Sequence, residues 1–236
     1  MNSVAHIGKF ALASSALFVC VGCLGTETGN PSETRSVSLA MVLKSSNSTV
    51  AQCSTEEPED APLGLTIDNA WLATNYVSLL GCMGDSGSRI DQSAWNLMRP
   101  VARSVATIEP SFCGFDFKTQ VADATLGALP AQFAGSSMWL TATRPDGVRV
   151  VIQSPVILNV NKGNASSPIT SSKVVIAIDA ADWLANINFS ALRPGSDGAI
   201  HVSPTSNVVQ LHVFEGQTSS DVVLRTEAND DGVTDD

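Results

Sequence analysis

Apolar residues alternate with polar or small ones along several stretches of the chain, and this period of two is typical of strands with one buried face. The stretch 37–43 shows it first. The same alternation runs from Leu65 through Trp71 to Leu79, which is long enough for one bent strand or two successive strands. Phe115 and Phe117 repeat it further along the chain. Each of these stretches is therefore predicted to be a strand.

A hairpin is the clearest single element. Strand-forming residues fill 138–144 and 148–153, and Pro145-Asp-Gly147 supplies the turn between them. Further strands are predicted over 156–160, 174–178 and 199–202. Several short strands separated by turn residues favour an all-β fold, an antiparallel β-sandwich.

Helix is expected only in one or two short pieces. Asp91 is placed to cap a helix that carries Trp95 and Met98 and ends before Pro100. Asp179 is placed to cap a second helix, which carries Trp183 and Leu184. Asp179 and Asp182 are interpreted as charges at a helix N-terminus rather than as an acid–base pair.

The N-terminal stretch has the features of an export signal. Lys9 precedes an apolar run over 10–21, which ends at Gly22 and Cys23. The run is too short for a transmembrane helix, which needs roughly 20 apolar residues. We therefore expect residues 1–22 to be a signal peptide that is removed.

Val21, Gly22 and Cys23 resemble the processing site of bacterial lipoproteins, although Cys20 stands where that family usually has Leu. The resemblance implies cleavage before Cys23 and a lipid-modified thiol whose acyl chains, palmitate among them, anchor the protein to the membrane. Each buried CH₂ of such chains adds about 0.8 kcal/mol. Leu24, by analogy with the family, indicates the outer membrane, on its periplasmic face or at the cell surface. The alternative is an ordinary secretion signal with Cys23 as a structural thiol.

A second resemblance begins directly after this cysteine, at Gly25-Thr-Glu-Thr-Gly-Asn-Pro31. This start is similar to that of a group of uncharacterised bacterial lipoproteins, related to a domain of unknown function of β-sandwich type. The similarity continues through Leu65-Thr-Ile-Asp-Asn-Ala-Trp-Leu72, Arg144-Pro-Asp-Gly147, Ile178-Asp-Ala-Ala-Asp-Trp-Leu184 and Asn229-Asp-Asp-Gly-Val-Thr-Asp235. The resemblance implies the same fold and an envelope location. It implies no activity, because none is established for that group.

These observations divide the chain into a signal peptide (1–22), a lipidated flexible tether (23–35), a β-sandwich domain (36–226) and an acidic tail (227–236). The chain has 13 basic and 23 acidic residues, a formal charge of −10, and removal of the signal takes away only Lys9 from this balance. Such a surface repels nucleic acid, which is therefore not an expected partner.

Three cysteines follow Cys23, and export places them in an oxidising compartment. Cys82 ends one predicted strand and Cys113 begins another, which favours a Cys82–Cys113 disulfide. A Cys53–Cys82 pair is the alternative. Their spacings are not those of a zinc site.

Candidates for catalysis are few. Gly84-Asp-Ser-Gly-Ser88 resembles the nucleophile loop of serine proteases, a family that also needs an upstream His and Asp. The upstream His6 lies in the signal peptide, and His201 and His212 both lie in stretches interpreted as strands. We therefore expect the protein not to be an enzyme.

The acidic tail spaces oxygen donors like the calcium loop Asp-x-Asn-x-Asp-Gly. The candidate metal ligands are Glu227, Asn229, Asp231, the Val233 carbonyl and Asp235. The first ligand is Glu rather than Asp, and the position of the bidentate Glu is missing, so a further ligand would come from elsewhere. Calcium is the candidate cofactor, and a disordered acidic tail is the alternative.

Anchor and fold together predict a lipid-anchored envelope or surface protein that binds a protein or polymer partner without catalysis. A carbohydrate-binding module is one alternative. It would need two or three aromatic side chains exposed in one plane, whereas Trp71 and Trp139 fall at strand positions expected to face the core. A hydrolase is the other alternative, and its sign would be a deep pocket holding His201 or His212 beside a carboxylate.

Overall fold

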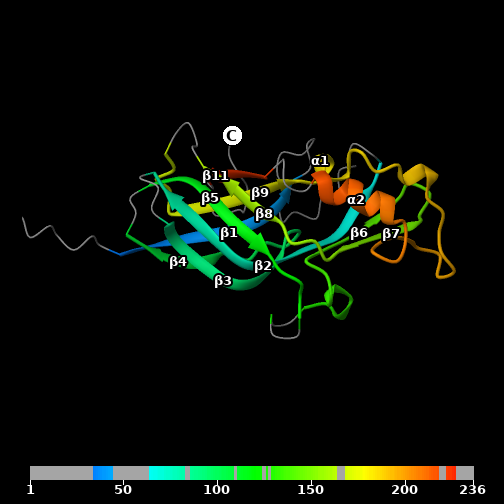
Figure 1. Ribbon diagram of the computed structural model, residues 1–236. Helices are drawn as coiled ribbons and strands as arrows, with labels where there is room; N and C mark the ends of the chain where they lie inside the picture. The colour runs from blue at the N-terminus through cyan, green and yellow to red at the C-terminus, as the bar shows by residue number, and fades with distance from the viewer. Residues whose placement is uncertain are drawn as a thin grey trace, which may run out of the picture. The chain divides into compact units, whose positions relative to one another are not determined.

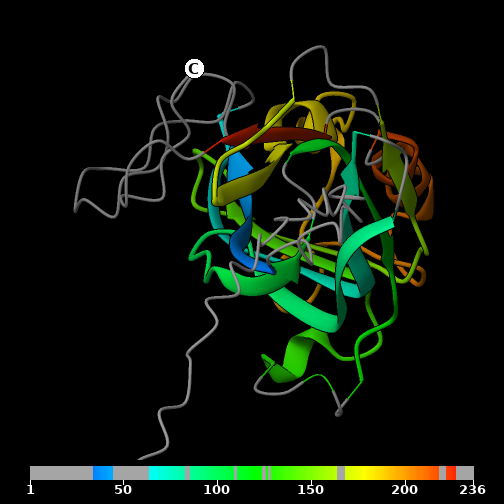
Figure 2. The same cartoon turned by 90° about the vertical axis from the view of Figure 1, so that its left-hand side faces the viewer.

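Two β-sheets form most of the structure (Figure 1). The computed structural model describes residues 34–44, 64–82, 86–108, 111–123, 126, 129–163, 168–217 and 222–226. Side chains from both sheets meet in one buried cluster, and the end-on view of Figure 2 shows the strands around this common interior. The predicted all-β, sandwich-type fold is confirmed.

The smaller sheet has four strands in the order β11-β9-β1-β4. Their bounds are Arg35–Lys44 (β1), Arg103–Thr107 (β4), Lys173–Asp179 (β9) and Val222–Thr226 (β11). Strands β1 and β9 run parallel, and the other neighbours in this sheet are antiparallel.

The larger sheet has seven strands, in the order β10-β7-β6-β2-β5-β8 with β3 also paired to β2. Their bounds are Thr66–Gly81 (β2), Ser86–Asn96 (β3), Phe112–Thr119 (β5), Met138–Thr143 (β6), Arg149–Ser154 (β7), Asn159–Lys162 (β8) and Ile200–Val202 (β10). The predicted hairpin is confirmed as β6 and β7. The strand expected at 156–160 begins later, at Asn159.

Strand β2, with 16 residues, changes the face it presents to the core twice. Its register with β6 shifts between Ile67 and Asn69, and its register with β5 shifts between Thr74 and Tyr76. A bulge adds one residue and so moves the following side chains to the opposite face of the sheet. The β2 residues in the core cluster or packed against it are therefore Ile67, Ala70, Leu72, Val77 and Leu79.

Trp71 and Trp139 pack inward as predicted, with Trp139 5% exposed and Trp71 half-buried, but they lie outside the main cluster because the first bulge of β2 turns Trp71 to the other face of the sheet. They are partners across β2 and β6 and belong to a second, smaller cluster. Phe133, from the segment that connects β5 to β6, packs in this second cluster. Both ends of this connection are hydrogen-bonded to Ala73 of β2. The Ala73 carbonyl accepts from the Gln120 amide, and the Ala73 amide donates to the Ser137 carbonyl.

Two short α-helices, α1 (Ala180–Leu184) and α2 (Val208–Gln217), add buried side chains to the main cluster. Asp179 caps α1 as predicted, since its carboxylate accepts from the Ala181 amide at 2.9 Å. The helix predicted after Asp91 is wrong. That stretch is β3, which pairs along β2, and Trp95 Nε1 donates to Thr74 Oγ1 of β2 at 3.0 Å.

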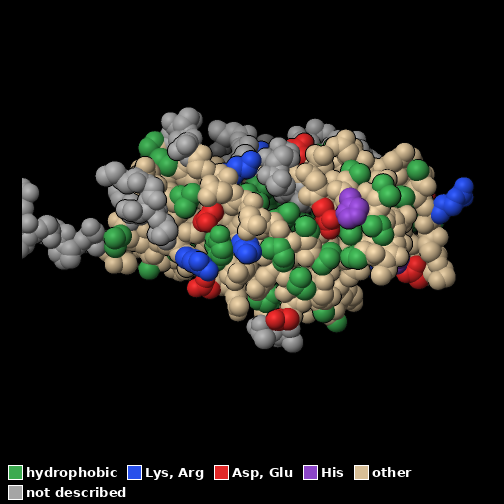
Figure 3. Space-filling view, viewed as in Figure 1, with side chains coloured by type: hydrophobic (Ala, Val, Ile, Leu, Met, Phe, Trp, Pro, Cys, Tyr) green, Lys and Arg blue, Asp and Glu red, His purple; other side chains and the backbone are tan. Residues whose placement is uncertain are grey.

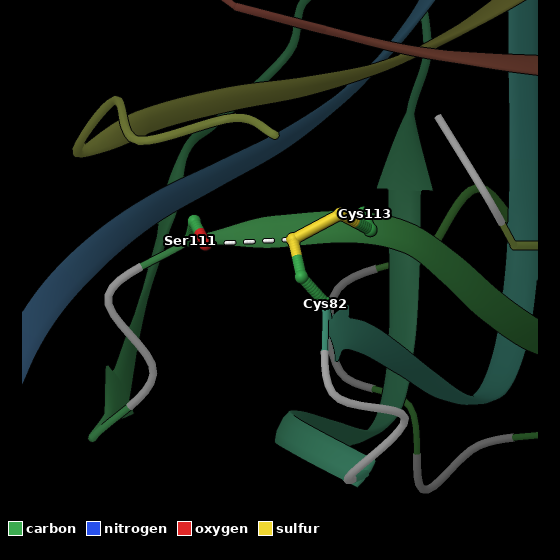
Figure 4. The surroundings of a disulfide bond; sticks show 3 residues. All are labelled: Cys82, Ser111 and Cys113. Atoms are coloured by element: carbon green, nitrogen blue, oxygen red, sulfur yellow. Dashed lines mark hydrogen bonds between the residues drawn. A yellow bond between two sulfur atoms is a disulfide. The ribbon is translucent and has the colours of Figure 1, made fainter. Parts of the chain in front are cut away.

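A disulfide joins Cys82, directly after β2, to Cys113 in β5 (Figure 4). The two Cα atoms are 4.7 Å apart, and Ser111 Oγ lies 3.4 Å from the Cys82 sulfur. The predicted pairing is confirmed. Because β2 and β5 are neighbours in the sheet, the bond closes the end of a strand pair that the backbone already forms.

We expect the double variant Cys82→Ala/Cys113→Ala to lose about 3–4 kcal/mol of unfolding free energy, since the 31-residue separation sets the chain entropy that the bond removes. Urea denaturation of both proteins measures the difference. A reducing agent should lower the stability of the wild type and leave the variant unchanged. Equal stability of the two proteins would contradict the prediction.

Candidate functional site

A pocket of about 310 Å³ opens beside α2, and we refer to it as the α2 pocket. Figure 3 shows the face of the molecule that carries α2, where hydrophobic side chains lie close to a histidine and an acidic side chain. The pocket is lined by Pro155, Val156, Pro204, Val208, Leu211, His212 and Glu215. Its walls thus come from α2, from the turn before it and from the connection that follows β7.

The position of α2 is set by its buried side chains. Leu211 and Phe214 are 3% and 1% exposed, and the Phe214 ring meets Trp183 of α1 edge-to-face at 5.9 Å. The spacing of these two residues buries one face of a helix. The rest of the helix surface is open to solvent, and near the start of α2 Val208 and Val209 are 40% and 72% exposed.

The turn before α2 holds the other wall of the pocket. Ser203 and Ser206 exchange two backbone hydrogen bonds around Pro204, at 2.8 and 3.1 Å. Asn207 then adopts a positive φ of 52°, and its side-chain amide donates to the His201 carbonyl at 2.7 Å. These contacts tie the first residues of α2 to β10.

Glu215 is the acidic group of the pocket, and both of its carboxylate oxygens are held. Ser154 Oγ donates to Glu215 Oε1 at 2.7 Å, and His212 Nδ1 lies 3.3 Å from Glu215 Oε2. Ser154 Oγ also accepts from the Val156 amide at 3.1 Å, which orients the hydroxyl toward Glu215. The Glu215 side chain is 16% exposed, so a negative charge stands at a defined place in a mainly apolar pocket.

The order of these three groups differs from that of a catalytic triad. A Ser-His-acid triad places the imidazole between the hydroxyl and the carboxylate, so that His takes the proton from Ser. Here the carboxylate of Glu215 stands in the middle, and the Ser154 hydroxyl donates to it. Ser154 is fully buried, whereas the His212 side chain is 71% exposed. The arrangement therefore holds a carboxylate in place and does not activate the serine.

His212 was expected in a strand, and that prediction is wrong. The run from Val208 to Phe214 is rich in β-branched residues, yet it forms α2 because Leu211 and Phe214 can both be buried only at helical spacing. His201 does lie in a strand, β10.

His201 forms a second histidine–carboxylate pair, away from the α2 pocket lining. Its Nε2 lies 2.7 Å from Asp197 Oδ2, and Asp197 Oδ1 accepts from the Ala199 amide at 3.1 Å. The hydrogen bond from His201, followed by that from the Ala199 amide, holds the pKa of Asp197 below its usual value. Both side chains are exposed, at 36% and 57%, so the pair stabilises a surface turn.

The stretch that resembles a protease nucleophile loop is part of an ordinary strand pair where the structure describes it. Ser86 begins β3, opposite Leu80 of β2. Ser88 Oγ donates to the Ala106 carbonyl of β4. Gly84 and Asp85 of this stretch lie outside the described residues.

The four tryptophans all fall within the described residues, and packing takes up their surfaces. Trp95, Trp139 and Trp183 are 3%, 5% and 3% exposed. Trp71 is half-buried, and its ring is tilted by 43° against Phe133 at 6.3 Å. These positions provide no coplanar, exposed pair of the kind that a sugar ring stacks on.

Several predicted site residues lie outside the described residues: Cys23, Cys53 and the tail ligands Glu227, Asn229, Asp231, Val233 and Asp235. Within the described part of the chain, no group of three His, Cys, Asp or Glu side chains could hold a metal ion. The helices of that part include none long and apolar enough to cross a bilayer.

The two sheets around one core define an all-β protein of the sandwich type. No protein-family model matches the sequence, and no curated protein matches it. Among solved structures, MbnP from Methylosinus trichosporium is similar to this chain with a TM-score of 0.46 and 11% sequence identity. The match covers 71% of this chain and 83% of that chain. At this level the likeness carries no argument about function.

The pKa of Asp197 tests the hydrogen bond between His201 and Asp197. Because the folded-state pKa is lowered, the pair stabilises the fold above the usual Asp pKa, and this contribution is lost as pH falls through the folded value. We expect His201→Ala to raise the pKa of Asp197 toward its usual value, measured by NMR titration of the side-chain carboxyl carbon. Asp146 is the matched control, since Arg144 is the main cause of its lowered pKa. An unchanged Asp197 pKa would refute the assignment.

Ser154→Ala tests the support of Glu215. The change leaves the Val156 amide and the half-buried carboxylate without the hydroxyl, so we expect a loss of about 1–3 kcal/mol in unfolding free energy. Glu215→Gln keeps an acceptor for Ser154 and should cost less than Ser154→Ala. Chemical denaturation of the three proteins gives both differences, and the reverse order would contradict this account of the pocket.

Proposed function

We propose that this chain is an exported, lipid-anchored protein of the cell envelope that binds a partner protein through the surface of α2, without catalysis. The observation that carries the proposal is the α2 pocket. It combines a held carboxylate, Glu215, with aliphatic side chains that remain exposed at Val208 and Val209. Apolar side chains grouped around a polar site are typical of surfaces that bind other molecules.

The anchor is supported by the sequence alone. The run that precedes Cys23 is that of an export signal, and Gly22 provides the small residue before the cysteine. An anchored protein meets partners at the membrane surface, where a local binding surface on the folded domain is sufficient for association. Envelope location thus accords with a role in binding.

Cys23→Ala tests the anchor. We expect the wild type to fractionate with membranes and to enter the detergent phase on Triton X-114 partitioning, whereas the variant becomes soluble because it lacks the acyl chains. Intact-protein mass spectrometry should show the lipid mass on the wild type only. Cys53→Ala removes another thiol and should leave the partitioning unchanged. A Cys23→Ala variant that stays in the membrane would overturn the anchor.

A photo-crosslinking residue at position 209 tests the binding surface. With p-benzoylphenylalanine in place of Val209, illumination of cells should join the protein to one specific partner. The same residue in place of Asp91, which is exposed on β3 while α2 packs against β7 and β10, should give no such product. Mass spectrometry of the crosslinked species identifies the partner segment. Equal products from both positions, or none from position 209, would refute the proposed surface.

A further inference from the structure

We propose that the α2 pocket receives a large apolar side chain of the partner, of the size of leucine or phenylalanine, from a segment whose neighbouring residues pack on Val209. This inference rests on the function proposed above and names the chemistry of the partner segment. It follows from the walls of the pocket, from the engagement of its polar groups and from the apolar surface that continues beyond it.

Apolar side chains form most of the pocket wall. Five of the seven lining residues are Pro, Val or Leu: Pro155, Val156, Pro204, Val208 and Leu211. A ligand gains here chiefly by leaving water, since the burial of apolar surface is favourable roughly in proportion to its area. The volume of about 310 Å³ is at the lower end of the range for ligand pockets, which suits one side chain better than a large cofactor.

The polar groups of the pocket already have partners within the protein. Ser154 Oγ donates to Glu215 Oε1 at 2.7 Å, and His212 Nδ1 lies 3.3 Å from Glu215 Oε2. None of the seven lining residues is Lys or Arg. A charged ligand group would lose its hydration in the pocket without an equivalent partner, whereas a carbon side chain has no such hydration to lose. The electrostatics of the pocket therefore favour an uncharged, apolar occupant.

Apolar surface continues past the pocket at the start of α2, which argues for a polypeptide rather than a small molecule. Val208 belongs to the lining and is 40% exposed, whereas the next residue, Val209, is 72% exposed and lies outside the lining. Ile157, which is 43% exposed, follows two residues after the lining residue Pro155. A ligand confined to the pocket cannot cover Val209. A chain that places one side chain in the pocket brings its neighbouring residues over this surface.

Peptides with a built-in photo-crosslinker test the inference on the full-length, lipidated protein in phosphatidylcholine vesicles. Their sequence is acetyl-Ser-Xaa-photoleucine-Ser-biotin, in which Xaa is Leu, Ala, Lys or Glu and photoleucine supplies the neighbouring aliphatic residue. We expect the leucine peptide to reach half-maximal labelling at about tenfold lower concentration than the alanine peptide, because its larger side chain buries more apolar surface. The lysine and glutamate peptides should label no better than the alanine peptide. Mass spectrometry should place the label on α2 or on residues 155–157.

A pocket-filling variant connects the labelling to the pocket. Val208→Trp places a large ring at a lining position and should abolish the advantage of the leucine peptide. Val121→Trp is the matched control, since Val121 is also 40% exposed but lies in the connection from β5 to β6, and it should keep the advantage. Equal labelling by the leucine and alanine peptides on the wild type, a preference for the lysine peptide, or an unaltered leucine advantage in Val208→Trp would overturn the inference.

A second variant tests the contact outside the pocket. Val209→Ser removes exposed apolar surface and should weaken labelling by the leucine peptide about threefold. Val101→Ser is the matched control, because Val101 is 74% exposed and lies in the connection from β3 to β4, and it should leave the labelling unchanged. Labelling that depends on Val208 but not on Val209 would contradict a polypeptide occupant and assign the pocket to a small apolar molecule.

The native partner separates the two proposals. If position 209 crosslinks a specific protein in cells through a segment without a large apolar residue, the proposed function stands and this inference is wrong. If the leucine peptide is preferred but position 209 yields no native protein, the apolar preference of the pocket stands and the proposed function is wrong. If neither is captured, both are wrong. A native segment that carries leucine or phenylalanine at the contact, lost in Val208→Trp, supports both.

Discussion

The pairing of β2 with its neighbours is the constraint on which the rest of the structure depends. Over 16 residues β2 pairs with β6 and then β5 along one side and with β3 along the other. Two register shifts occur along this strand, one in its pairing with β6 and one in its pairing with β5. Each shift turns the following side chains of β2 to the other face of the sheet. The middle part of β2 consequently places Trp71 and Ala73 outside the main core. The connection from β5 to β6 covers them, and the disulfide closes the far end of the β2–β5 pair.

The α2 pocket depends on the same core. Phe214 and Leu211 fix the helix by burial, which turns Val208 and Val209 outward and brings Glu215 against Ser154 at the end of β7. Because Ser154 is held in turn by the Val156 amide, the carboxylate has one orientation. These contacts and the 16% exposure of its side chain distinguish Glu215 from an ordinary exposed acid.

Part of the site could have been anticipated from sequence, and part could not. Leu211 and Phe214 stand three residues apart, which is a helical signal, but Val208, Val209 and Val213 around them favour a strand. Burial against α1 decides for the helix, and no local pattern reports that burial. The contact between Ser154 and Glu215 joins residues 61 apart. Nothing in either neighbourhood predicts it, since a serine at a strand end and a glutamate in a polar stretch are common.

The sequence by itself determined the all-β class, the hairpin of β6 and β7, the Asp179 cap and the Cys82–Cys113 pair. Each of these depends on local signals: alternation, turn residues, a capping side chain, and cysteines at strand ends. Only the tertiary structure decided that the stretch after Asp91 is a strand and that Trp71 and Trp139 lie outside the main core. The reason is physical, because backbone pairing with β2 outweighs a capping signal, and a bulge reverses the faces of a strand without altering its sequence pattern.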